Sequence, residues 1–308
     1  MSYSPQAGGD YDVRSLRHER RMLGVYRRRE RSDGGDLQPL ANACWRAGSF
    51  EWALSGDARV TRSLWAEGAR ALAEGFTGGF SGFDPSPDQY ILALNLAVAG
   101  RDADCLATLA HLGPGLISGA MRDARAFRGA PGLINLAEGY SFIARALAEN
   151  NPGAIAAAVS SLDAALEESQ AAWWNERFPN PREARWLETE HRSVCILLGQ
   201  IARVVARAGT AIPPSTDLAA RGLTGKSASV EEKLSGAIDD AILQRNRFVD
   251  SDSNHHPKLY IWLPGLAVCG LAMAAGLPMN WLRTGQGTSN RVADRLPLPL
   301  LVNDAGSF

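Results

Sequence analysis

The chain has 308 residues, of which 45% are apolar and 21% are charged. This composition is typical of a globular protein and excludes a disordered or fibrous chain. The formal net charge is only −1, so we do not expect the chain as a whole to bind nucleic acids. The first residues carry no apolar stretch, and the sequence therefore predicts no secretory signal.

Four cysteines lie far apart in the sequence and include no CxxC pair: Cys44, Cys105, Cys195 and Cys269. This spacing fits neither a disulfide framework nor a zinc site. We therefore expect reduced, mostly buried thiols. Together with the lack of a visible leader, this predicts a cytoplasmic protein.

Helical signals dominate the chain. Apolar residues recur at three- and four-residue spacing, whereas the alternating runs typical of strands are nearly absent. Ser86-Pro87-Asp88-Gln89 combines an N-cap serine, a proline at the first helical position and a glutamine that completes a capping box. Similar helix starts occur at Asn151, Asn180 and Ser229.

The sequence therefore predicts an all-α protein, an irregular multi-helix bundle of about ten helices. We expect a single helical domain over residues 1–308, with a long surface loop at 209–228, where Pro, Gly, Ser and Thr are frequent. Four glycines fall where helix C-caps are expected: Gly100, Gly113, Gly209 and Gly276. The expected helices span residues 11–31, 38–54, 57–76, 87–99, 102–112, 131–149, 152–174, 182–208, 230–247 and 257–275.

The N-terminal helix expected at 11–31 is the most charged part of the chain. Residues 14–31 hold eight arginines against two glutamates, a local charge of +6, which leaves −7 for the remainder. An arginine-rich helix can bind phosphates or an acidic partner. The reading that we favour is a solvated helix face, because no aromatic platform accompanies the basic run. It places four apolar side chains inward: Val13, Leu16, Leu23 and Tyr26.

Residues 259–277 contain no charge and are just long enough to cross a membrane. Pro264 and the glycines of this segment fit better with a tightly packed helix inside a bundle. We therefore expect the helix at 257–275 to be buried, with Leu266 and Leu271 in the core, and we expect no membrane span.

Motifs for catalysis and for cofactor binding are missing. The sequence has no GxSxG, no phosphate-binding GxxxxGK[ST] and no GxGxxG after a strand. His255 and His256, near Asp250 and Asp252, lack the three- or four-residue spacing of metal ligands on a helix. The sequence thus predicts no catalytic residue, no metal site and no cofactor.

A cluster of aromatic and charged residues at the junction of two long expected helices, 152–174 and 182–208, is the candidate partner-binding site. Trp and Arg are enriched at the energetic centres of protein interfaces. The alternative is that the tryptophans close the core at a helix junction. The residues are Trp173, Trp174, Arg177, Trp186 and Glu190.

Four segments share a pattern with a known family. They are SLWAEGARALAEGF, PDQYILALNLAVAGRDADCLATLAHL, HRSVCILLGQIARVVARAG and HHPKLYIWLPGLAVCGLAMAAGLP, within residues 57–278. The second carries most of the likeness, with a long apolar helix followed by Arg101-Asp102 and a leucine-rich helix. In this order the segments resemble the immunity protein 49 family. The Arg-rich N-terminus, the 209–228 loop and the C-terminal tail depart from the family's pattern.

The resemblance implies an all-helical, cytoplasmic protein of a bacterial polymorphic-toxin system. Such a protein binds a cognate toxin domain by direct protein–protein contact and neutralises it, and the family supplies no catalytic residues. We therefore expect an immunity protein rather than an enzyme, with a toxin domain as partner and neither nucleic acid nor membrane. One alternative is a helical-repeat-like scaffold or regulatory protein-binding module. A helical enzyme without a recognisable motif is the third reading.

Overall fold

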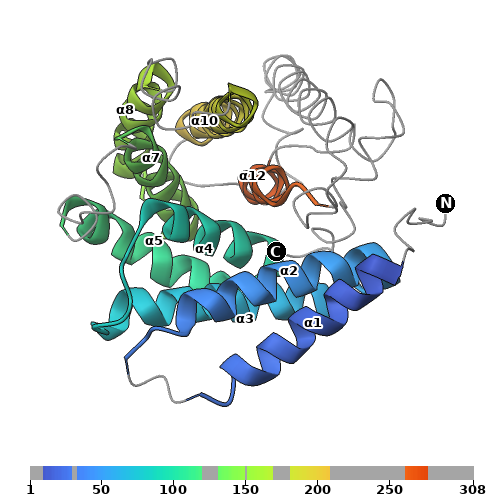
Figure 1. The fold of residues 1–308 in the computed structure, drawn as a ribbon. Helices are drawn as coiled ribbons and strands as arrows, with labels where there is room; N and C mark the ends of the chain where they lie inside the picture. Colours follow the sequence, from blue (N-terminus) through green and yellow to red (C-terminus); the bar gives the residue numbers. More distant parts are fainter. Residues whose placement is uncertain are drawn as a thin grey trace, which may run out of the picture.

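A computed structural model describes residues 10–29, 33–119, 131–149, 151–168, 181–208 and 261–276. Within these ranges all regular structure is α-helix and no strand is present, so the all-α prediction is confirmed for the described residues. The helices, shown in Figure 1, are α1 (Asp10–Tyr26), α2 (Leu37–Ser55), α3 (Ala58–Gly78), α4 (Pro87–Gly100), α5 (Ala103–Ser118), α7 (Pro131–Ala148), α8 (Gly153–Glu168), α10 (Pro181–Ala208) and α12 (Leu263–Ala274).

The predicted capping box at the start of α4 is present. The backbone N–H of Gln89 donates to Ser86 Oγ at 3.2 Å, and the Ser86 N–H donates to Gln89 Oε1 at 3.2 Å. Helices α8 and α10 begin within one residue of their predicted starts. The predicted helix at 230–247, the 209–228 loop and Gly209 lie outside the described residues.

Two predicted C-cap glycines are wrong, because Gly100 and Gly113 allow close packing and neither takes the left-handed capping conformation. The helix expected to end at residue 112 continues to Ser118. A Cβ at Gly113 would lie 2.2 Å from the hydroxyl oxygen of Tyr90, so only glycine lets α5 pass α4 at this point. At Gly100 a Cβ would lie 2.6 Å from Ala66 N of α3, and the left-handed capping residue is Arg101, with φ 59°.

The first and last described helices are shorter than the sequence predicts. The N-terminal helix ends at Tyr26 and not at residue 31. Residues 27–29 turn back toward α2, with Arg29 Nη1 2.8 Å from Asp36 Oδ1. The last helix begins at Leu263, where Pro264 occupies the first turn. Proline suits that position because its missing N–H has no partner there.

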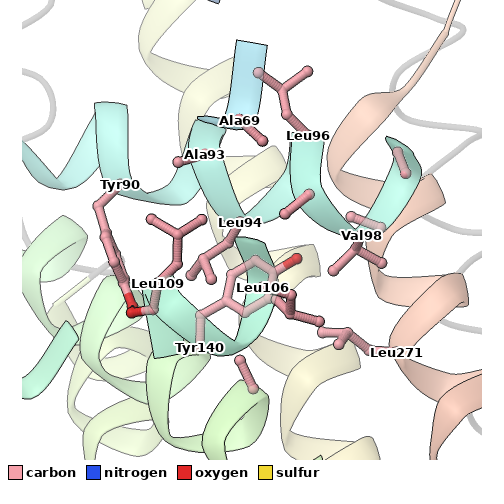
Figure 2. Close-up of a cluster of buried hydrophobic side chains, with 14 of the residues drawn as sticks. Ala69, Tyr90, Ala93, Leu94, Leu96, Val98, Leu106, Leu109, Tyr140 and Leu271 are labelled. Atoms are coloured by element: carbon pink, nitrogen blue, oxygen red, sulfur yellow. The ribbon is translucent and has the colours of Figure 1, made fainter. Parts of the chain in front are cut away.

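Helix α4 lies at the centre of the described fold, in contact with α3, α5, α7 and α12. Every residue from Ala93 to Ala99 is buried. Figure 2 shows apolar side chains of α4, α5, α7 and α12 meeting around Leu94. Two buried tyrosines satisfy polar groups in this core: Tyr90 donates to the carbonyl oxygen of Leu109 at 2.6 Å, and Tyr140 donates to Asn95 Oδ1 at 2.9 Å.

Helix α12 is buried against α4, α7 and α10. Leu266 is 0% and Leu271 is 1% exposed, so their predicted place in the core is confirmed. With 12 residues the helix spans about 18 Å. A hydrocarbon core is about 30 Å thick. None of the helices in the described ranges combines the length and apolar character needed to span a membrane.

The corner between α4 and α5 depends on one carboxylate. Asp102 is the N-cap of α5 and accepts the backbone N–H of Cys105 at 3.0 Å. The same side chain forms an ion pair with Arg70 of α3, whose Nε lies 2.6 Å from Asp102 Oδ2. The Asp102 carboxylate is only 7% exposed. One side chain therefore ties the start of α5 to α3.

We expect Leu266→Ala to lower the free energy of unfolding by about 2–5 kcal/mol, because it opens a cavity beside α4. Val60 is 36% exposed on α3, so Val60→Ala is the control and should change stability by less than about 0.5 kcal/mol. Urea unfolding followed by circular dichroism measures both. Similar losses in the two variants would contradict the placement of α12.

The two roles of Asp102 separate by substitution. Asp102→Ala removes both the cap and the ion pair, and should cost about 1–2 kcal/mol of unfolding free energy. Asp102→Asn keeps a capping oxygen but loses the negative charge that pairs with the largely exposed Arg70 side chain. Such an ion pair is worth at most about 1 kcal/mol. Chemical denaturation of both variants measures the difference. Equal losses would show that the cap contributes little.

Candidate interaction surface

The sequence-predicted binding cluster falls largely outside the described residues. Trp173, Trp174 and Arg177 lie in the range 169–180, which is not described. Trp186 and Glu190 lie on α10, but their side chains are outside the described part. Whether the five residues gather on one surface therefore stays a prediction.

Helix α1 packs against α2 through one side, at the edge of the described bundle (Figure 1). Its inward residues follow the four- and three-residue spacing of one helix face: Asp12, Leu16, Glu19, Leu23 and Tyr26. The predicted inward position of Val13 is wrong, because Val13 is 37% exposed. A residue next to Asp12 in sequence is rotated by about 100° from it around the helix, which turns it out of the contact.

Ion pairs hold α1 and the turn after it to the neighbouring elements. Arg46 of α2 lies with its Nε 2.8 Å from Glu19 Oε1, and Arg20 pairs with Glu51, five residues further along α2. Beyond the end of α1, Arg27 donates from Nε to Glu67 Oε1 of α3 at 2.7 Å and from Nη2 to Oε2. This hydrogen bonding raises the pKa of Arg27 above its ordinary value.

The charges of α1 are sorted by sign between its two sides. The two α1 carboxylates with described burial, Asp12 and Glu19, are only 2% and 8% exposed. The arginines of residues 10–29 are all exposed. In the ion pairs with Glu51, Glu67 and Asp36 the arginine side chain is also the more exposed partner, at 57% against 8%, 47% against 29% and 56% against 22%. The solvent-exposed side of α1 and of the turn after it therefore presents guanidinium groups.

Three of these arginines form no ion pair with any residue that the structure describes: Arg17, Arg21 and Arg28. Arg17 and Arg21 are about one turn apart on α1. Arg28 lies in the turn that follows the end of this helix at Tyr26. We call Arg17, Arg21 and Arg28 the arginine row. Because its positive charge is not compensated within the described chain, the arginine row is the candidate interaction surface.

The sequence pointed to the arginine-rich helix but did not separate its arginines. The acidic partners Glu51 and Glu67 lie far along the chain, so no local pattern reveals them. Arg17 and Arg21 could be grouped from the sequence, since residues four apart share a helix side. The expected inward side was right for Leu16, Leu23 and Tyr26. The inward position of Glu19 depends on Arg46 of α2 and has no local signal.

Burial favours the neutral forms of three cysteines and one histidine of the core. All four cysteines are buried and none forms a disulfide, as the sequence predicts. Burial raises the pKa of Cys105, Cys195 and Cys269 to about 12, so these thiols are poor nucleophiles. His191 of α10 is 4% exposed, and its burial lowers its pKa to about 4. Among the described residues, no group of three or more His, Cys, Asp or Glu side chains is arranged to hold a metal ion.

His191 makes the fold sensitive to acid. Its folded-state pKa of about 4 lies below the ordinary value of 6.5, so the unfolded chain binds the proton first as pH falls. Stability contributed by the neutral imidazole is present above pH 6.5 and is lost as pH falls toward 4. We expect His191→Gln to lose less thermal stability than the wild type over this window. Above pH 7 the melting temperatures of the two proteins should change with pH by the same amount. An equal change between pH 6.5 and 4 would contradict this role of His191.

Comparison with known proteins places the chain in no group. No family model matches it, and searches of curated proteins and of solved structures gave no match.

Proposed function

We propose that the protein is an immunity protein that neutralises a cognate bacterial toxin domain by direct protein–protein contact in the cytoplasm. The proposal starts from the resemblance of four segments to the immunity protein 49 family. The described parts of these segments belong to α3, α4, α5, α10 and α12, the helices that form much of the core around α4. The resemblance therefore concerns residues that specify this fold.

The observation that carries the proposal is the charge sorting of α1. A solvated helix gains most when opposite charges alternate on its surface, because neighbouring like charges repel. Here the acidic side chains Asp12 and Glu19 are buried and the arginines are exposed, which concentrates one sign of charge outside. A single-sign surface favours fast, oriented association with a partner of opposite charge. This is the property an inhibitor needs to reach its toxin before damage occurs.

A scaffold or regulatory module is the second candidate. Successive helices pack as pairs with short connections: α2 with α3, α4 with α5, and α7 with α8. Stacked helix pairs are the building unit of helical-repeat scaffolds. The pairs differ in length and in their contacts with α4, whereas a repeat array presents equivalent contacts. This irregularity favours the immunity reading.

Co-expression with the toxin tests the proposal. The gene next to the one for this chain should encode a large protein whose C-terminal domain is toxic when expressed alone. We expect cells that carry this protein to survive and the two proteins to co-purify as a stable complex. Asp102→Asn, a change at the corner between α4 and α5 that keeps the capping oxygen, serves as a control and should still protect.

Survival without complex formation would contradict neutralisation by contact. An operon of regulatory genes with no toxic neighbour would favour the scaffold reading. The predicted cluster at 173–190 is tested in the same cells: if it contacts the toxin, Trp174→Ala with Arg177→Ala should weaken protection while the melting temperature stays within a few degrees.

A further inference from the structure

We infer that the arginine row, formed by Arg17 and Arg21 of α1 and Arg28 of the turn after it, is the docking surface for a carboxylate-rich segment of the partner protein. The inference rests on the proposed function only for the identity of that partner. It commits to one chemistry, a protein surface dense in Asp and Glu. The described chain supplies no ion-pair partner for the three arginines of the row.

The row carries an electrostatic cost within the monomer. Arg17 and Arg21 are four residues apart on one helix, a spacing at which like charges destabilise the helix. The carboxylates nearest in sequence do not relieve this repulsion, because Glu19 turns inward to Arg46. Glu51, Glu67 and Asp36 are paired with other arginines. Carboxylates supplied by a partner would remove the repulsion.

The helix that carries Arg17 and Arg21 is also held firmly against its neighbours. Glu19 with Arg46 and Arg20 with Glu51 join α1 to α2, and the buried Leu23 packs in the core cluster. A helix held in this way presents its outward side chains with little loss of backbone freedom on binding. Preorganisation of this kind raises affinity by lowering the entropy cost of association.

A protein partner fits the row better than a nucleic acid. Proteins that hold nucleic acids through the backbone typically neutralise about six to ten phosphates. The row offers three uncompensated charges, and the flanking Arg20, Arg27 and Arg29 are already paired with carboxylates. Guanidinium groups form bidentate hydrogen bonds with carboxylates, so three of them suffice to orient an acidic segment.

The test uses the full chain and two labelled probes, a short poly-glutamate peptide and a single-stranded DNA of the same length. Fluorescence anisotropy measures binding at low and at high salt. The test variant carries Arg17→Gln, Arg21→Gln and Arg28→Gln. The matched control carries Arg59→Gln, Arg192→Gln and Arg203→Gln, three exposed arginines of α3 and α10 with the same change in net charge.

We expect the wild type to bind poly-glutamate more tightly than DNA, with affinity falling as salt rises. The test variant should lose about tenfold in affinity and the control variant less than twofold, because three exposed ion pairs together are worth about one order of magnitude. Thermal unfolding confirms that both variants are folded. If the triple test variant does not fold, the single variants Arg17→Gln and Arg21→Gln replace it, and each should lose about twofold.

Equal losses in the two triple variants would overturn the inference, because net charge alone would then explain binding. Tighter binding of DNA, or no binding of poly-glutamate, would overturn it as well. The toxin assay is independent of these probes. A toxin complex that the test variant forms at wild-type affinity would refute this docking surface while leaving the proposed function intact. Poly-glutamate binding that depends on the row, together with the absence of any toxin partner, would support this docking surface and refute the proposed function.

Discussion

The enclosure of α4 is the constraint on which the rest of the described fold depends. Because Ala93–Ala99 are buried all round, neighbouring helices must cover every side of α4 and satisfy its polar groups. Tyr140 of α7 does so for Asn95, and Tyr90 of α4 reaches the backbone of α5. Close approach of α5 then requires Gly113, since a Cβ there would meet the Tyr90 hydroxyl. Packing around one helix thus decides where α5 can run.

Helix α1 follows a different rule from the core helices. Its hold on α2 combines apolar contacts of Leu23 with ion pairs in which the acidic partner is the less exposed one. Placing carboxylates inside and guanidinium groups outside uses the shorter acidic side chains for the contact and leaves the longer arginines to extend into water. The result is a stable edge whose outer side is positive, on a chain with almost no net charge. The described chain thus combines a buried core around α4 with a positively charged outer side of α1.

Part of the fold could be predicted from interactions between residues that are close in the sequence. The Ser86 capping box predicted the start of α4, because its hydrogen bonds join residues three apart. The burial of Leu266 followed from an uncharged segment too rich in Gly and Pro for a simple span. The candidate surface could be predicted only in part. The arginines are visible in the sequence, but Glu67, which pairs with Arg27, lies in another helix and has no local signal.

The sequence by itself determined the helical class of the described chain, several helix starts and the burial of the apolar C-terminal helix. Hydrogen bonding within a few residues and the periodicity of apolar side chains suffice for these. Only the tertiary structure decided that α5 continues through Gly113, that Arg101 and not Gly100 takes the left-handed cap, and that Val13 faces solvent. Each depends on which atoms of a distant helix lie within a few ångströms, and that is a property of packing in space.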